Sequence, residues 1–197
     1  RMGSAKQLLP FKGESILAGV LKETLCSELD TVVLVLGSGA EEIEKALGKN
    51  LAHPKLKVVR NPRHPEGMST SIAAGLSCVA STHDHVMILL ADMPLIHADV
   101  INLLIEKYLA SGLPLGALSV GGKRVHPVVF SRRFYAALYA LKGDVGGRRL
   151  FREYGESVCL VESPRPGVDR DVDTPEDYAD FRSARGDGAE EAPGKPS

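Results

Sequence analysis

An aspartate stands directly after one of the most apolar stretches of the chain. The stretch HVMILLAD (85–92) is typical of a buried strand, so Asp92 is expected at the strand's carboxyl end. Open α/β sheets bind ligands at that end of their strands. A carboxylate there suits Mg²⁺, which is usually shared with substrate phosphates. For Asp92 alone, an ordinary turn residue followed by Pro94 is an equally good interpretation.

A second group of acids lies far along the chain, in DRDVDTPEDY (169–178). Asp169, Asp171 and Asp173 alternate with other residues, so in an extended segment they project to the same side. One of them could supply a second metal ligand. Capping of the following helix by Asp173 or Thr174 is the structural alternative, and the two roles are compatible.

The opening stretch RMGSAKQLLPFKG has the composition of an anion-binding loop. Gly3 permits close approach of the backbone to a ligand, and exposed amides there can hold phosphate oxygens. Arg1 and Lys6 add two cations that suit a polyphosphate. By itself, a basic stretch of this kind is more often solvated surface.

Two further segments contain polar residues at expected helix starts. In NPRHPEGMSTSIAAGL (61–76), Gly67 and Ser69 begin a helix, and Ser71 is the better candidate for contact with a base or ribose. Ser69 by itself reads as an ordinary N-cap. In KGDVGGRR (142–149), three glycines and Arg148 indicate an anion-binding turn, although a simple glycine-rich connection is the alternative.

One histidine, His126, stands before Pro127 at an expected strand, in KRVHPVVF (123–130). A lone histidine near a strand is more often structural than catalytic. No GxxxxGK[ST], GxGxxG or GxSxG motif is present, so P-loop, dinucleotide-binding and hydrolase-elbow functions are unsupported.

Composition limits the class of protein further. The chain has 197 residues, which fits one domain, and a formal net charge of −1, which argues against nucleic acid as a partner. Its three cysteines have no metal-site spacing and read as reduced thiols of a cytoplasmic protein. No apolar run approaches membrane-spanning length, so no membrane partner is expected.

Apolar runs alternate with amphipathic segments along the chain. Expected strands cover 31–37, 56–61, 85–92, 115–120, 126–130 and 157–163. Expected helices cover 15–29, 40–48, 70–81, 98–110, 132–141, 146–154 and 175–183, with Ser15, Ser69 and Thr174 as N-caps. This alternation predicts an α/β fold with a doubly wound, mostly parallel sheet. The domain is expected over 1–182, followed by a disordered tail over 183–197.

A sheet of this type normally leads from its first strand into its first ligand loop. Here the loop stands at the start of the sequence and no strand precedes it. We therefore expect one strand and its turn, about ten to fifteen residues, upstream of Arg1.

Taken together and in order, these segments resemble the MobA-like nucleotidyltransferases. RMGSAKQLLPF is similar to the second half of the family's signature loop, LAAGxSxRMGxxKxLLPF. The later matches, in the family's order and spacing, are GMSTSIAAGL, LLADMPLI, HPVVF, GDVGGR and DVDTPEDY. The resemblance covers about residues 1–182, and the molybdenum cofactor cytidylyltransferases are the subgroup that the chain resembles most.

The resemblance implies a Rossmann-like nucleotidyltransferase fold and a role for each motif. It implies that Arg1, Gly3 and Lys6 bind the triphosphate, and that Gly67 and Ser71 face the nucleotide base. It assigns Mg²⁺ to Asp92, with Asp173 as its partner and Asp171 as the alternate, and makes Lys6 and Asp92 the catalytic pair. His126, Asp144 and Arg148 are expected on the pterin side.

The implied reaction moves CMP from CTP to the phosphate of molybdopterin, with release of pyrophosphate. One alternative is a transferase that uses GTP, or that acts on a sugar or alcohol phosphate. A second alternative, of another class, is a non-catalytic molybdenum cofactor carrier for a molybdoenzyme. A molybdenum hydroxylase is accordingly a further candidate partner.

Overall fold

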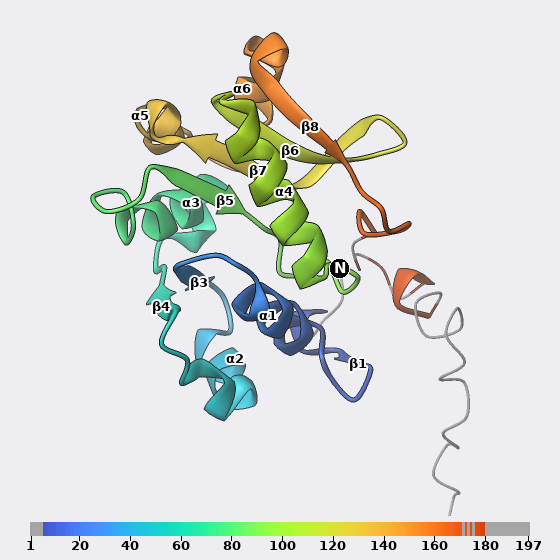
Figure 1. Cartoon of the computed structure of the whole chain (residues 1–197). Coiled ribbons are helices and arrows are strands. Elements are labelled where there is room, and N and C mark those ends of the chain that lie inside the picture. Colours follow the sequence, from blue (N-terminus) through green and yellow to red (C-terminus); the bar gives the residue numbers. More distant parts are fainter. Residues whose placement is uncertain (1–5, 171, 173, 175, 180–197) are drawn as a thin grey trace, which may run out of the picture.

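The computed structural model describes residues 6–170, 172, 174 and 176–179 (Figure 1). The strands are β1 (Pro10–Phe11), β2 (Glu14–Ser15), β3 (Val32–Leu36), β4 (Leu56–Arg60), β5 (His85–Ile88), β6 (Leu115–Val120), β7 (Lys123–Ser131) and β8 (Val158–Glu162). The α-helices are α1 (Ile16–Cys26), α2 (Ala40–Leu47), α3 (Met68–Ser77), α4 (Ala98–Ser111), α5 (Tyr135–Tyr139) and α6 (Arg148–Glu153). Short 3-10 helices are η1 (Lys6–Leu8), η2 (Gly48–Leu51), η3 (His64–Glu66), η4 (Arg132–Phe134) and η5 (Gly155–Ser157).

The expected α/β architecture is confirmed, but the sheet is mixed rather than mostly parallel. β3 and β4 pair in parallel, and a four-stranded sheet has the order β5-β7-β6-β8. In it β6 and β8 are parallel, whereas β7 is antiparallel to both of its neighbours. The short β1 and β2 form a separate antiparallel pair.

A tight turn explains the antiparallel course of β7. Gly121 and Gly122 join β6 to β7 with φ angles of +57° and +75°. Positive φ at both central residues is the requirement of the two-residue turns that reverse a chain into a hairpin, and glycine meets it without strain. The apolar patterns of the two strands do not indicate their relative direction, and this glycine pair is the sequence feature that marks the reversal.

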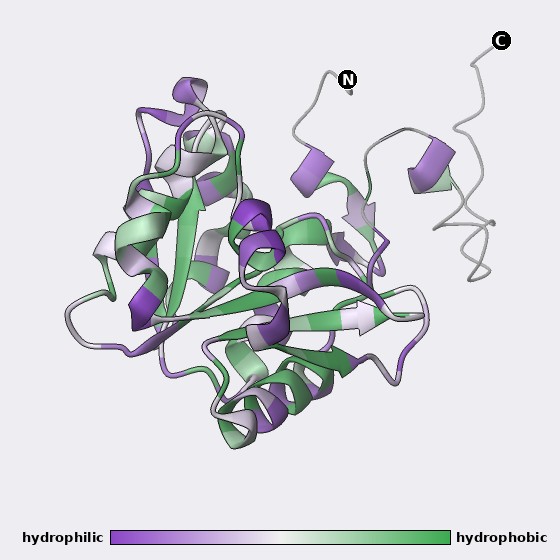
Figure 2. Ribbon diagram, turned by 90° about the horizontal axis from the view of Figure 1, so that it is seen from above, coloured by the Kyte–Doolittle hydropathy of each residue, from purple (hydrophilic) through white to green (hydrophobic). Residues whose placement is uncertain are grey.

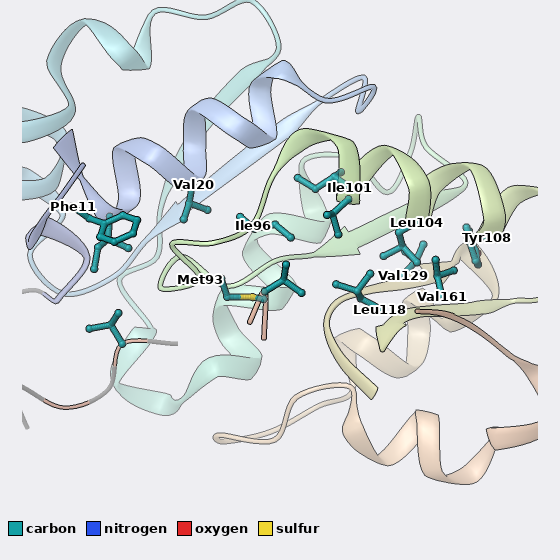
Figure 3. Close-up of a cluster of buried hydrophobic side chains, with 14 residues drawn as sticks. Phe11, Val20, Met93, Ile96, Ile101, Leu104, Tyr108, Leu118, Val129 and Val161 are labelled. Carbon is teal, nitrogen blue, oxygen red and sulfur yellow. The ribbon is translucent and has the colours of Figure 1, made fainter. Parts of the chain in front are cut away.

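Helices cover both faces of the four-stranded sheet (Figure 1). On one face, α4 packs Ile101, Leu104 and Tyr108 in a cluster with Leu118, Val129 and Val161 of the strands (Figure 3). On the other face, residues of α3, α5 and α6 surround Phe130, which is fully buried. Hydrophobic residues accordingly concentrate on the strands in Figure 2. Burial on both faces is the reason that these strands read as continuous apolar runs.

The edges of β3 and β5 remain unpaired among the described strands. β3 pairs only with β4 and β5 only with β7. A cavity of about 620 Å³ is lined by residues of both strands, including Val33, Val35 and Met87. Two unpaired strand edges with apolar side chains between them have the form of a place for one more strand. The upstream strand expected from the sequence stays a prediction.

The expected helix starts have different outcomes. Ser15 caps α1, because its side chain accepts a hydrogen bond from the Ala18 amide at 3.2 Å. Thr174 and Asp177 exchange backbone-to-side-chain hydrogen bonds, so that N-cap is confirmed as well. The prediction for Ser69 is wrong: α3 begins at Met68 with Gly67 as its N-cap, which places Ser69 inside the first turn.

Two further expectations concern the ends of the chain and its environment. The tail over 183–197 lies outside the described residues. Among the residues that are described, none of the helices has both the length and the apolar character needed to cross a membrane. The cysteines Cys26, Cys78 and Cys159 are free, as expected, although Cys26 is exposed.

Candidate functional site

Asp92 follows β5 and lies beside Lys6, which is brought to it from the start of the chain by η1. Lys6 Nζ and Asp92 Oδ2 are 2.5 Å apart, and the two side chains are 28% and 18% exposed. Partial burial reduces the screening of such a pair by salt. The structure therefore places side by side the cation and the carboxylate that the sequence singled out. The strand is shorter than the expected 85–92, because β5 ends at Ile88, and Asp92 lies in the turn that follows it.

The segment after β8 runs against the same strand end. The Val172 amide donates a hydrogen bond to the Asp92 carbonyl at 3.3 Å. Val168 and Val172 are buried in the cluster that contains Met93 and Ile96. Asp171 and Asp173, the expected second metal ligands, lie outside the described residues, but Val172 between them in the sequence is anchored at Asp92.

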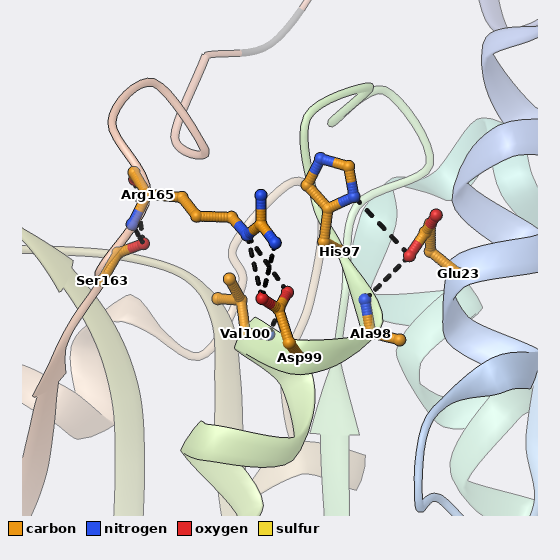
Figure 4. A network of polar contacts seen from close by, with 7 residues as sticks. All are labelled: Glu23, His97, Ala98, Asp99, Val100, Ser163 and Arg165. Atoms are coloured by element: carbon orange, nitrogen blue, oxygen red, sulfur yellow. Dashed lines mark hydrogen bonds and ion pairs between the residues drawn. The ribbon is translucent and has the colours of Figure 1, made fainter.

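A polar network joins the segment after β8 to α4, and joins α4 to α1 (Figure 4). Arg165 donates from Nε and Nη2 to the Asp99 carboxylate, with the shortest distance 2.7 Å, and its guanidinium lowers the pKa of Asp99. Glu23 of α1 accepts a hydrogen bond from the Ala98 amide at 2.9 Å, and its carboxylate lies 3.6 Å from His97 Nδ1. These contacts fix the first turn of α4, which comes directly after the Asp92 loop.

The start of α3 is organised by Asn61, a buried residue directly after β4. Asn61 Nδ2 donates to Ser71 Oγ at 3.0 Å and to Thr70 Oγ1 at 2.9 Å. Ser71 accepts this hydrogen bond, so its own hydroxyl proton can still be donated to a ligand. Ser71 also lines the cavity between β3 and β5. Asn61 is not among the site residues expected from the sequence, although an amide side chain directly after an apolar strand could have indicated it.

Gly67 has a structural role that the sequence did not reveal. Its φ is +109°, and a Cβ atom at this position would collide with the backbone of Gly143. Beside this close approach, the Ser69 amide donates to the Gly143 carbonyl at 3.0 Å, and the Met68 amide donates to Asp144 Oδ1 at 3.1 Å. The motif expected at the nucleotide and the motif expected at the acceptor are thus joined directly.

His126, Asp144 and Arg148, the three residues expected on the acceptor side, line one cavity of about 440 Å³. His126 Nδ1 lies 3.3 Å from the Ile88 carbonyl of β5. Burial lowers the pKa of His126 and so favours the neutral ring, although the hydrogen bond to Ile88 acts in the opposite direction. Arg124 lines the same cavity and was not singled out in the sequence.

The residues expected to form the site are therefore found in three neighbouring places. Lys6 pairs with Asp92. Gly67, at the start of α3, lies against the loop that contains Asp144, and Ser71 of α3 accepts a hydrogen bond from Asn61. Arg1 and Gly3 lie outside the described residues, so their expected contact with the triphosphate stays a prediction.

The donor set suits a divalent cation that shares its ligands with a substrate. Within the described part of the chain, no group of three or more histidine, cysteine or carboxylate residues could enclose a metal ion by itself. Mg²⁺ usually binds one or two protein carboxylates and completes its shell with substrate phosphates and water. Asp92, partly exposed at the end of β5, fits that requirement.

Solved structures of similar fold define the fold class of this chain. Rv0371c from Mycobacterium tuberculosis matches with a TM-score of 0.80 and 24% identity, covering 93% of this chain and 91% of that one. A structure of the same protein in complex with manganese has a TM-score of 0.76 and 24% identity, covering 91% and 92%. CMP:2-keto-3-deoxy-manno-octonic acid synthetase complexed with CTP matches at 0.69 and 16%, covering 93% and 92%. The fold is the α/β nucleotidyltransferase fold.

The family follows from the sequence match. The model described as MobA-like NTP transferase domain matches residues 1–158, and this chain belongs to that family. Purine catabolism protein PucB from Bacillus subtilis is 33% identical, covering 93% of this chain and 91% of that protein. Nicotine blue oxidoreductase from Paenarthrobacter nicotinovorans is 27% identical, covering 87% and 84%. Molybdenum cofactor cytidylyltransferase from Escherichia coli is 25% identical, covering 90% and 87%.

Proposed function

We propose that this protein transfers CMP from CTP to the terminal phosphate of molybdopterin, with release of pyrophosphate. The observation that carries the proposal is the pairing of Lys6 with Asp92 at the end of β5. It is supported by membership of the MobA-like family and by 25% identity to the Escherichia coli molybdenum cofactor cytidylyltransferase.

The reaction needs positioning and charge neutralisation more than proton transfer. An oxygen of the acceptor phosphate forms a bond to the α-phosphorus of CTP. The bond from that phosphorus to the oxygen bridging to the β-phosphate breaks, and pyrophosphate leaves with the electron pair. Because the attacking phosphate is already an anion, no general base is required.

The residues divide between the two substrates. Lys6, together with Arg1 and Gly3, would hold the triphosphate and stabilise the charge that develops on pyrophosphate. The Ser71 hydroxyl, oriented by Asn61, would contact the nucleoside beside Gly67. On the other side, His126, Asp144 and Arg148 would face the acceptor.

A divalent cation completes this proposal. Asp92 would hold it, together with Asp173 or Asp171, whose segment is anchored by the hydrogen bond from Val172 to Asp92. The bound Mg²⁺ would supply positive charge where two phosphates must approach. The manganese complex of the mycobacterial protein of the same fold supports a divalent cation in this role.

The test replaces Asp92 by Asn and measures pyrophosphate release from CTP with molybdopterin and Mg²⁺. Loss of charge stabilisation of this kind costs about a hundredfold or more in rate. Glu106→Gln is the matched control, because Glu106 is exposed on α4 and pairs with its neighbour Lys107. A rate for Asp92→Asn within a few-fold of the wild type would exclude the metal assignment.

The 33% identity to PucB favours a second candidate, a transferase of the same chemistry with another nucleotide or acceptor. Comparing CTP, GTP and ATP in the same assay separates the two candidates. If the protein binds molybdopterin but releases no pyrophosphate with any nucleotide, it is instead a carrier that delivers cofactor to a partner such as a molybdenum hydroxylase.

A further inference from the structure

The cavity on the acceptor side contains more positive charge than the sequence motifs assign to it. Arg124, His126, Asp144, Arg148 and Phe151 are among its lining residues, in a volume of about 440 Å³. Arg148 belongs to a motif of the family, whereas Arg124 of β7 comes from none of the assigned positions. The two arginines reach the cavity from different elements, β7 and α6.

Arg124 is held in place by an aromatic ring rather than by an acid. Its guanidinium carbon lies 4.5 Å from the centre of the Phe151 ring. Such stacking orients a guanidinium while leaving the N–H groups at its edge available to a ligand. Among the residues that the structure describes, neither Arg124 nor Arg148 has a carboxylate within ion-pair distance.

The two cations lie close enough to influence each other. The pKa of Arg124 is lowered, first by burial and second by the positive charge of Arg148. The acid of the same cavity, Asp144, accepts a hydrogen bond from the Met68 amide at 3.1 Å, which occupies one of its oxygens. Arg124 is half-buried whereas Arg148 is exposed, and an anion bound between the two cations would relieve the repulsion between them.

The cavity also reaches β5, the strand that leads to Asp92, because Ile88 at the end of β5 is among its lining residues. His126 of the same cavity lies 3.3 Å from the Ile88 carbonyl. An anionic group held by the arginines would therefore lie in a cavity that extends to the end of β5.

We infer that Arg124 and Arg148 form a binding site for a phosphate group of the acceptor substrate. Its assignment to the acceptor rests on the proposed nucleotidyl transfer, but the phosphate site itself does not. Two guanidinium groups match the double negative charge of a phosphate monoester better than the single charge of a carboxylate. The new element is Arg124, which would bind the acceptor's phosphate together with Arg148.

The experiment titrates the nucleotide-free protein with inorganic phosphate and follows binding by NMR. We expect roughly tenfold weaker phosphate binding for Arg124→Gln and for Arg148→Gln, because each variant loses a charge-assisted contact. Arg152→Gln is the matched control, since Arg152 is an exposed residue of α6 outside the cavity lining. Thermal unfolding of each variant verifies that it is folded, and Arg124→Lys should recover part of the affinity.

A further variant separates this site from the nucleotide site. Lys6→Gln should leave unchanged the phosphate-induced NMR shifts of residues around Arg124, because Lys6 pairs with Asp92 and does not line this cavity. Phosphate binding that is lost in Lys6→Gln but kept in Arg124→Gln would overturn the inference. Acetate binding as tightly as phosphate would overturn the phosphate class.

Failure of this inference can be distinguished from failure of the proposed function. If phosphate binds through Arg124 and Arg148 while no nucleotide yields pyrophosphate, the transferase proposal fails and the phosphate site stands. If pyrophosphate is released and its acceptor dependence is the same in Arg124→Gln and the wild type, the transferase proposal stands and the inference fails.

Discussion

Replacement of Gly67 by Ala tests whether the α3 start and the 143–144 loop are held together by close backbone contact. A Cβ atom at Gly67 would collide with the backbone of Gly143, which cannot move aside as the end of a flexible side chain could. Gly67 also has a φ of +109°, a conformation that costs a residue with a side chain about 1–3 kcal/mol.

Separation of the two segments would add to that cost. It would break the hydrogen bonds from the Ser69 amide to Gly143 and from the Met68 amide to Asp144, each worth about 1 kcal/mol. We therefore expect Gly67→Ala to lower the free energy of unfolding by about 3 kcal/mol or more. For a domain of this size each kcal/mol changes the Tm by roughly 2–4 °C, so a decrease of roughly 6–12 °C is expected.

Gly143→Ala is the matched control at the other side of the same contact. Gly143 has a φ of +66°, but a Cβ atom there would have no other atom within 4 Å. Its cost is limited to the left-handed conformation, about 1–2 kcal/mol. Thermal and urea unfolding, followed by circular dichroism, measure both variants. The reasoning is refuted if Gly67→Ala is no more destabilising than Gly143→Ala.

Two other predictions concern His126 and the cavity between β3 and β5. Burial lowers the pKa of His126 below its value in the unfolded chain, so the unfolded state binds more protons and stability falls as the pH drops below about 7. His126→Gln should lose less stability over this range in urea unfolding; an equal loss would contradict the assignment. An apolar β-strand segment of about five residues joined by a turn upstream of Arg1 should fill the cavity and raise the Tm by roughly 5 °C or more. A Gly/Ser segment of the same length is its control, and equal Tm values for the two would contradict a strand site.

The sequence predicted the elements well, because their signals are local. The runs around Val33, Met87 and Val129 have the continuous apolar character of strands buried on both faces, and all three lie in strands. Ser15 was recognised as an N-cap because a serine oxygen before an apolar helical run satisfies a free amide at the helix start.

The pairings between distant segments were not predictable in the same way. Ser69 resembled a cap by residue type, yet its amide is satisfied by the carbonyl of Gly143, so no cap is needed at that position. The antiparallel direction of β7 depends on the turn at Gly121 and Gly122, and the pleat pattern of an apolar strand carries no information about its direction. Long-range contacts of this kind leave no periodic signal in the sequence.

In the candidate site too, some residues are marked by a local sequence signal and others are brought together only by the fold. The place of Asp92 after an apolar strand could be predicted, because the sequence itself marks that position, whereas its role at a metal ion stays a prediction. Arg124 could not be predicted, since it is one of 24 lysine and arginine residues and its proposed role depends on contacts with residues that are distant in the sequence. Only the fold brings it to Phe151 and within the electrostatic influence of Arg148.

The net charge of the whole chain is for this reason a poor guide to its ligands. A value of −1 argues against a broad basic surface, but binding of a small anion depends on charges within a few ångströms. Near β5, Lys6 and Asp92 balance each other, whereas Arg124 and Arg148 have no acid partner among the described residues. Such a division of charge would attract one anionic substrate to the arginines and leave Lys6 for the other. Two negatively charged substrates could then be bound at separate places by a chain that is itself slightly acidic.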